Sequence, residues 1–243
     1  MPVFASIHLG KCAGAAFANL LIERVSQHMP VLFLYGEAHP LSGVWRDRSK
    51  QTSAATTSPK QICEPFVAKA ENGESFLVHS HFAASEYLEF LPNATFFTWL
   101  RNPLQRISSH YYYWKNNRLE PRLSPEAKPL FERVVAGECS LVEFGCHPLV
   151  AEYYRGMLAP LGLDGLALAA VVEHPSVSFG ELSRLLDVEL PLEMRVANAT
   201  RSKLAERYEL TTEEESHLRA CNTADLKLYE RAVARLLGEQ RSG

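Results

Sequence analysis

A lysine among small residues follows the first apolar segment of the chain. Residues 7–17 read Ile-His-Leu-Gly-Lys-Cys-Ala-Gly-Ala-Ala-Phe, which places Lys11 in a short loop between an expected strand and an expected helix. Backbone N–H groups at a helix start attract anions, and small side chains let a phosphate or sulfate approach them. The segment therefore indicates an anion-binding loop with Lys11 as its mobile charge. A plain strand–turn–helix junction with a surface lysine is the alternative.

A second polar turn follows a strongly apolar segment in the middle of the chain. Residues 94–100 predict a buried strand, Arg101 comes at its carboxyl end, and Ser109 lies two turns into the helix expected next. Open α/β sheets bind ligands at the carboxyl ends of their strands, and an arginine and a hydroxyl can grip one phosphate. The alternative is that Arg101 pairs with a structural carboxylate and that the tyrosines at 111–113 only pack in the core.

Two histidines alternate along a short apolar segment that reads Val-His-Ser-His-Phe over residues 78–82. Residues i and i+2 of a strand share a face, so His79 and His81 point the same way. Such a pair can bind a metal or transfer protons. A metal needs a third and usually a fourth ligand, and no nearby pattern of Cys, Asp or Glu supplies them, so we expect no metal. A structural pair bonded to the backbone is the alternative.

The segments that must position these residues alternate between strand and helix, which predicts a parallel sheet. Apolar runs predict strands over residues 3–9, 31–35, 76–79, 94–100 and 169–172, and helical spacing predicts helices over residues 15–25, 64–70, 104–114, 125–136, 149–158, 176–186 and 211–237. Residues 36–62 are rich in Ser and Thr and poor in large apolar groups, so we expect one long, exposed, mobile loop. No repeat and no linker is visible, and residues 1–243 are expected to form a single domain.

The composition narrows the class of protein. The chain has 243 residues, of which 47% are hydrophobic and 22% charged, values that exclude disorder, collagen and coiled coil. Its net charge of −3 argues against a general nucleic-acid binder. The five cysteines are odd in number and widely spaced, which predicts free thiols in a reducing cytosol. No segment is apolar enough for a membrane span and the start lacks a signal-peptide pattern, so we expect a cytoplasmic protein.

The three motifs resemble those of the sulfotransferases that use 3′-phosphoadenosine 5′-phosphosulfate (PAPS), and among them the carbohydrate type that includes heparan sulfate 2-O-sulfotransferase. The first loop of that family has the form F-x-H-I-P-K-T-G-G-T, and residues 4–15 read F-A-S-I-H-L-G-K-C-A-G-A. Its second element has the form R-D-P-x-x-R-x-x-S-x-Y-Y, and residues 101–112 read R-N-P-L-Q-R-I-S-S-H-Y-Y. The positions in register are His8, Lys11, Gly14, Arg101, Pro103, Arg106, Ser109, Tyr111 and Tyr112.

The resemblance implies a P-loop-type, three-layer α/β fold with a central parallel sheet flanked by helices. It assigns the 5′-phosphosulfate of PAPS to the first loop, the 3′-phosphate to the second, and a basic segment near residue 200 to closure over the nucleotide. The donor-binding residues implied in this way are Lys11, Cys12, Ala13, Gly14, Ala15, Ala16, Arg101, Ser109, Arg201 and Lys203.

The resemblance also implies roles in the reaction. Lys11 would neutralise the charge that grows on the leaving phosphate oxygen, and His81, in the place of the second histidine of the family's H-x-H, would take the acceptor's proton. His79 and Arg106 are expected to contact the substrate. No metal is required.

The first loop departs from the family pattern. Hydroxyl residues of the family are replaced by Cys12, Ala15 and Ala16. Hydrogen bonds to charged groups are worth about 1.5–3 kcal/mol each, so the loss of two would weaken donor binding about a hundredfold or more unless the backbone and Lys11 suffice.

The main hypothesis is therefore a PAPS-dependent sulfotransferase that acts on a hydroxyl of a carbohydrate or a small metabolite. One alternative is a degenerate sulfotransferase fold that binds a nucleotide or a partner without turnover. The other is a P-loop kinase, although the Walker lysine and its Ser or Thr are absent. The resemblance does not cover residues 36–62 and 117–160, which we expect to choose the acceptor.

Overall fold

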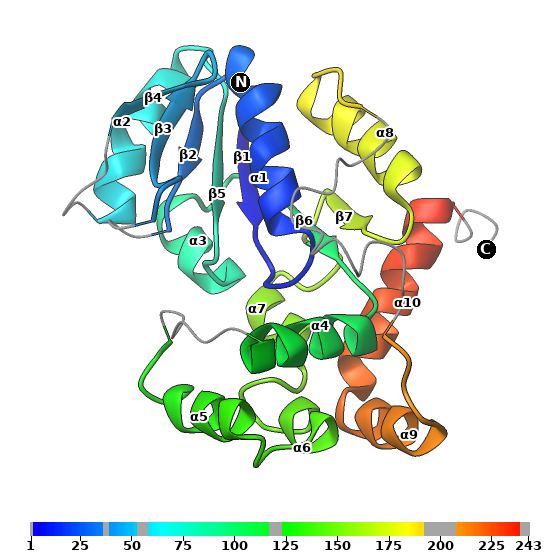
Figure 1. Cartoon of the computed structure of the whole chain (residues 1–243). Coiled ribbons are helices and arrows are strands. Elements are labelled where there is room, and N and C mark those ends of the chain that lie inside the picture. Colours follow the sequence, from blue (N-terminus) through cyan, green and yellow to red (C-terminus); the bar gives the residue numbers. More distant parts are fainter. Residues whose placement is uncertain (1, 36–38, 53–57, 117–122, 192–207, 239–243) are drawn as a thin grey trace.

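A mostly parallel sheet forms the centre of the structure, a computed structural model that describes residues 2–35, 39–52, 58–116, 123–191 and 208–238 (Figure 1). In these residues the sheet has seven strands in the order β4-β3-β2-β5-β1-β6-β7. The strands are β1 (Val3–Ile7), β2 (Val31–Phe33), β3 (Gly43–Arg46), β4 (Ser49–Thr52), β5 (Phe76–Ser80), β6 (Thr95–Leu100) and β7 (Leu168–Val171). β1, β2, β5, β6 and β7 pair in parallel, whereas β3 and β4 are antiparallel additions at one edge.

Helices cover both faces of the sheet, which confirms the predicted three-layer α/β fold. α1 and α8 lie on one face and α2 lies on the other (Figure 1). α3 contacts α2, α7 contacts α3, and α10 contacts α7, α8 and β7. The helices are α1 (Gly14–Glu23), α2 (Pro59–Glu71), α3 (Ala84–Phe90), α4 (Pro103–Asn116), α5 (Lys128–Ala136), α6 (Leu141–Gly145), α7 (Tyr153–Leu158), α8 (Pro175–Leu186), α9 (Thr212–Cys221) and α10 (Thr223–Leu237), with a 3₁₀ turn η1 (Val25–Gln27).

The apolar side chains form two clusters. The larger one contains the buried faces of the strands and of the helices packed on them. The smaller one joins α4, α5, α6 and α9, which gather beyond the end of the sheet where β1 and β6 end (Figure 1). α10 contributes to both, with Ala232 in the larger and Leu226 in the smaller. The predicted strands at 3–9, 76–79, 94–100 and 169–172 are confirmed, each within three residues at its ends.

The prediction of one long loop over residues 36–62 is wrong. The described part of this range contains the β3–β4 hairpin and the first turn of α2. Asp47 and Arg48 form the turn with φ values of 49° and 62°, and their N–H groups donate to the backbone oxygen and the Oγ of Ser26 at 2.8 and 2.9 Å. A distant residue therefore holds this turn, so no local Asn-Gly signal is needed. Residues 36–38 and 53–57 lie outside the described residues.

The single helix expected over residues 211–237 is two helices, α9 and α10, separated by Asn222. The buried Asn222 amide donates to the oxygens of Gly145 and Leu218 at 3.1 and 2.9 Å, and its Oδ1 accepts from the N–H of Glu152 at 3.2 Å. These bonds attach the break between the helices to α6 and to the start of α7. The break therefore depends on contacts with distant residues, which helical periodicity in the sequence does not reveal.

The expectation that every cysteine is a free thiol is wrong for one pair. Cys146, after α6, and Cys221, at the end of α9, form a disulfide with a Cα–Cα distance of 5.3 Å. They are 75 residues apart, so their proximity depends on the packing of the smaller cluster and not on a local motif. Cys12, Cys63 and Cys139 are free and buried. In the described residues, no helix has both the length and the apolar character that crossing a bilayer requires.

Alkylation of the unfolded chain tests the pairing of Cys146 with Cys221. With iodoacetamide in denaturant and no reductant, mass spectrometry is expected to find three of the five cysteines modified, and all five after reduction. Cys146→Ser is expected to raise the unreduced count from three to four, because Cys221 loses its partner. Modification of all five cysteines without reductant would contradict the pairing.

Candidate functional site

The three predicted motifs lie at the same edge of the sheet because their strands are neighbours and run in parallel. Ile7 pairs with Ser80 of β5 and with Thr98 of β6. The N–H of His8 donates to the oxygen of Ser80 at 2.8 Å, and the Thr98 hydroxyl donates to the oxygen of Ile7 at 2.7 Å. The segments that follow β1, β5 and β6 therefore leave the sheet side by side.

The loop after β1 presents backbone N–H groups. Lys11 and Ala13 have φ values of 69° and 62°, a left-handed conformation that is uncommon outside glycine, and α1 starts at Gly14 without a side-chain cap. The first N–H groups of an uncapped helix lack intrahelical acceptors and attract anions. Ala15 is exposed and Ala16 half-buried, so neither side chain blocks this helix start.

Cys12 does not fit its expected place among the donor-binding side chains. It is buried, its N–H donates to the oxygen of Leu9 at 3.3 Å, and its Sγ lies 3.3 Å from the hydroxyl of Tyr154. Burial raises the pKa of the thiol to about 11, so it stays protonated. The thiol therefore packs behind the loop, which leaves ligand binding to the other residues of the segment.

Lys11 lies against an exposed aromatic ring. Its Nζ is 3.9 Å from the ring centroid of Tyr113 on α4, a cation–π distance. Burial, and next the nearby charge of Arg101, lowers the pKa of Lys11 to about 8. Two positive groups thus share this place, and no carboxylate of the described residues forms an ion pair with either of them.

Three imidazole rings stack at the ends of β1 and β5. The ring of His8 lies between those of His79 and His81, with centroid distances of 4.8 and 4.0 Å. The two histidines of the H-x-H pattern therefore share one side, as their spacing predicts. His79 is buried, its Nδ1 is 2.8 Å from the Oγ of Ser6, and burial lowers its pKa to about 3. The expectation that His79 touches the substrate is thus not supported, since its ring does not reach the surface.

His81 has the geometry of a base. Its Nδ1 is 2.9 Å from the backbone oxygen of His8, and because a carbonyl only accepts, Nδ1 carries the proton of the neutral ring. This leaves the lone pair of Nε2 available, and no hydrogen bond from the residues that the structure describes engages it. The residue is exposed as a whole, while the protein around its ring desolvates it and lowers its pKa below the ordinary value. His81 is therefore neutral near pH 7 and can accept a proton at Nε2.

The ring of His8 is fixed on two sides by residues that sequence analysis gave no such role. The Tyr35 hydroxyl, just past β2, is 2.8 Å from His8 Nδ1, and burial raises the pKa of this phenol, which stays protonated. A Cβ on Gly14 would lie 1.5 Å from His8 Nε2, so any larger residue at this position would force the ring to move. The ring of His39 lies 4.6 Å from that of Tyr35. The position of Tyr35 at the end of the strand next to β5 is the signal that could have indicated it.

Arg101 lies just before α4, and Ser109 lies within this helix. Asn102 caps the helix, since its Oδ1 accepts from the N–H groups of Leu104 and Gln105 at 3.1 and 3.3 Å. Both Arg101 and Ser109 are half-buried. In the described residues, no hydrogen bond or ion pair engages the Arg101 guanidinium or the Ser109 hydroxyl. Both groups are free to bind a phosphate.

Arg106 does not fit its expected contact with the substrate. It is 2% exposed, its Nη2 donates to the oxygen of Val150 at 3.0 Å, and its guanidinium lies 4.6 Å from the ring centroid of Tyr153. Burial raises the pKa of the Cys12 thiol, and the nearby charge of Arg106 offsets a smaller part of this rise. Arg106 therefore packs on the inner side of the loop after β1 and adds positive potential near Cys12.

Arg201 and Lys203 lie outside the described residues. The chain returns at Tyr208, whose N–H and oxygen bond the side chain of Gln105 on α4 at 2.9 and 3.1 Å. The ring of Tyr208 stacks on that of Tyr112, with centroids 5.2 Å apart. Tyr208, the first described residue after them, thus packs against α4.

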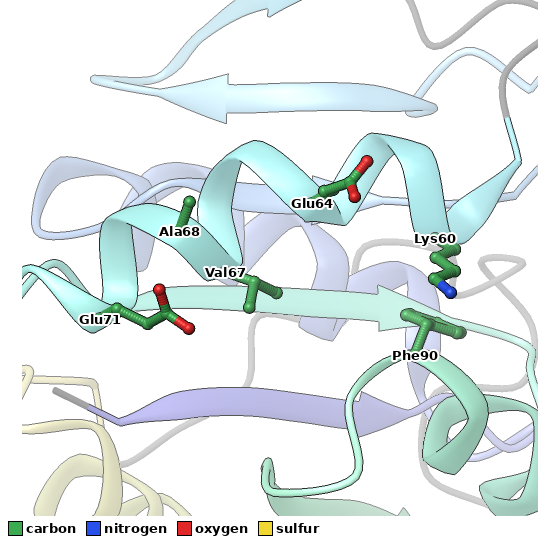
Figure 2. A pocket seen from close by; sticks show the side chains of 6 residues that line it. All are labelled: Lys60, Glu64, Val67, Ala68, Glu71 and Phe90. Atoms are coloured by element: carbon green, nitrogen blue, oxygen red, sulfur yellow. The ribbon is translucent and has the colours of Figure 1, made fainter.

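Two other features of the described residues bear on ligands. No group of three or more His, Cys, Asp or Glu in them is arranged to hold a metal ion. A pocket of about 300 Å³ lies along α2 beside Phe90 of α3 (Figure 2). It contains none of the predicted site residues, and the two carboxylates among its lining residues make it a poor place for an anion. Its lining residues are Lys60, Glu64, Val67, Ala68, Glu71 and Phe90.

Comparison with known proteins gives solved structures alone. No protein-family model matches the sequence, and no curated protein is significantly similar to it. A sulfotransferase from Alicyclobacillus acidocaldarius is 17% identical, with 95% of both chains covered and a TM-score of 0.47. Mouse sulfotransferase SULT7A1, solved in complex with PAP, is 14% identical, with 100% of this chain and 85% of that chain covered and a TM-score of 0.42. Similarities of this size leave the function to be inferred from the site itself.

Replacing Gly14 tests the packing of the His8 ring. Gly14→Ala places a methyl group on His8 Nε2, and the forced shift is expected to lower the free energy of unfolding by about 1–3 kcal/mol in urea denaturation. Gly180→Ala is the control, because no atom lies within 4 Å of the added Cβ and alanine favours the helix α8. Equal stability of Gly14→Ala and the wild type would show that the ring does not occupy this place.

Proposed function

We propose that the protein transfers a sulfuryl group from PAPS to a hydroxyl of a carbohydrate or a small metabolite. One observation carries the proposal. The same sheet edge joins an uncapped helix N-terminus, the cations Lys11 and Arg101, and an imidazole, His81, with a free Nε2. Sulfuryl transfer needs an anion site, a cation for the leaving group and a base for the acceptor.

The two cations and the start of α1 would bind different phosphate groups of the donor. The N–H groups at Gly14–Ala16 and the Nζ of Lys11 would bind the 5′-phosphosulfate, while Arg101 and Ser109 would bind the 3′-phosphate. A 3′-phosphate distinguishes this donor from ATP. We assign a further contact with the nucleotide to Arg201 and Lys203, as the resemblance implies.

In the proposed reaction His81 takes the proton of the acceptor hydroxyl at Nε2 as the acceptor oxygen forms its bond to sulfur. The bond from sulfur to the 5′-phosphate oxygen breaks in line, and adenosine 3′,5′-bisphosphate leaves. Lys11 neutralises the charge that develops on this phosphate oxygen, and the helix N-terminus adds N–H donors. The backbone oxygen of His8 keeps His81 in the tautomer that can act as a base.

The second candidate is a protein of the same fold that binds the nucleotide without turnover. The first loop favours it, since Cys12 faces the core and Ala15 and Ala16 offer no hydroxyl. The free Nε2 of His81 favours turnover, because binding alone needs no base.

A cytoplasmic location remains our expectation from the sequence, although the Cys146–Cys221 disulfide is of a kind that persists in oxidising compartments.

Calorimetric titration with adenosine 3′,5′-bisphosphate tests the donor site, with ATP as the competing ligand. The bisphosphate is expected to bind more tightly than ATP, and Arg101→Ala is expected to weaken it at least tenfold by removing a charge-assisted contact. Arg184→Ala is the control, because Arg184 is an exposed arginine of α8 paired with Glu181. Absence of binding at millimolar bisphosphate would contradict the proposal.

Replacing His81 separates binding from chemistry. His81→Ala is expected to leave the affinity for the bisphosphate unchanged and to lower transfer from labelled PAPS at least a hundredfold across a panel of sugar and phenol acceptors. In the wild type, the rate is expected to fall on the acid side with a midpoint below about 6.5, because a lowered pKa keeps the base deprotonated to lower pH. A normal rate in His81→Ala would exclude this residue as the base.

A further inference from the structure

Two adjacent tyrosines at the start of α7 join the two loops that we assign to the phosphates. The Tyr154 hydroxyl donates to the backbone oxygen of Arg101 at 2.7 Å and accepts from the N–H of the same residue at 3.2 Å. It also lies 3.3 Å from the Sγ of Cys12. The Tyr153 hydroxyl accepts from the N–H of Gly10 at 3.3 Å. One helix start therefore holds the loop after β1 and the loop after β6.

The bonding capacity of the Tyr154 hydroxyl is fully used. A phenol has one proton to donate and two lone pairs to accept with. Its proton goes to the Arg101 oxygen, so it accepts from the Arg101 N–H and can accept from the Cys12 thiol, whose Sγ also lies 3.8 Å from the Gly10 oxygen. The thiol can donate because burial keeps its pKa high. A shift of either loop therefore breaks hydrogen bonds to a tyrosine hydroxyl and leaves a buried polar group unsatisfied.

The start of α7 is itself held in place. The two carboxylate oxygens of the buried Asp225, on α10, accept from the N–H groups of Tyr154 and Arg155, both at 2.9 Å. The Arg106 guanidinium lies 4.6 Å from the ring centroid of Tyr153. The ring of Tyr154 is completely buried. These contacts make the pair of tyrosines a rigid link and not a loose contact.

We propose that Tyr154 is a positioning residue that fixes the distance between the two phosphate subsites and so gives preference for a nucleoside 3′,5′-bisphosphate. The inference rests on the proposed function. A ligand with two phosphates gains from both subsites only when their separation matches its own. A ligand with one phosphate needs a single subsite and gains nothing from the link. Loss of the link must therefore act on the bisphosphate and spare the monophosphates.

Tyr154→Phe tests this, because it keeps the buried ring and removes the hydroxyl alone. The ligands are adenosine 3′,5′-bisphosphate, adenosine 5′-monophosphate and adenosine 3′-monophosphate, each titrated by calorimetry. The Kd of the bisphosphate is expected to rise at least tenfold, and the Kd of each monophosphate less than threefold. Tyr111→Phe is the matched control, because it removes a buried hydroxyl that donates to the oxygen of Cys139 at 3.0 Å in the smaller cluster. It is expected to change none of the three.

The outcomes separate the two proposals. If the wild type binds the bisphosphate and Tyr154→Phe weakens all three ligands by the same factor, or none of them, the positioning role is wrong and the proposed function stands. If the wild type does not bind the bisphosphate, the proposed function fails and the inference fails with it. Where circular dichroism shows that Tyr154→Phe is unfolded, Tyr153→Phe replaces it. This variant frees the Gly10 N–H and is expected to show the same selective loss.

Discussion

The site depends on the place of β1 between two strands that run in its own direction. Parallel strands end at one edge of a sheet, so the segments after β5 and β6 start on either side of the segment that follows β1. The bond from the His8 N–H to the Ser80 oxygen continues the pairing past the end of β1. Cations from two of the segments and an imidazole from the third therefore meet without any long loop.

This arrangement concentrates positive charge at the ends of β1 and β6. Lys11 and Arg101 are near enough for the charge of Arg101 to contribute to the lowered pKa of Lys11, and the buried Arg106 lies behind them. Like charges in a partly desolvated place repel, so this pair of cations carries an electrostatic cost that a polyanion would remove. Such an anion would also raise the pKa of Lys11 and so favour the ammonium form that the proposed reaction uses. Affinity and activation of the lysine thus have one physical origin.

Sequence analysis could predict what depends on local pattern. Apolar runs and helical spacing gave the strands and helices that frame the site, and the i, i+2 spacing placed His79 and His81 on one side. It could not predict what depends on distant contacts. The β3–β4 turn is held by Ser26 from another part of the chain, and the motif residue Arg106 is buried because Tyr153 and Val150 come to cover it.

The tyrosines of α7 are the converse case, because they contact the site although no sequence motif marks them. No motif marks their segment, which the sequence predicts as part of the acceptor region, yet their hydroxyls bond the loops after β1 and β6. Such a role requires only that a phenol hydroxyl lies near both loops, and any element of the fold can place one there. A pattern of residue types contains no such information.

The hairpin at the edge of the sheet limits how copies of the protein can associate. β4 reads Ser-Lys-Gln-Thr, and its Ser49 and Lys50 are exposed, so the outermost strand at this edge is short and polar. Short, charged edge strands are poor templates for a neighbouring chain. At the other edge, β7 is buried and packed by α8 and α10. Neither edge strand of the described sheet therefore favours pairing with a strand of a second copy. The ends of β1, β5 and β6 can stay accessible while edge-to-edge association of the sheets is disfavoured.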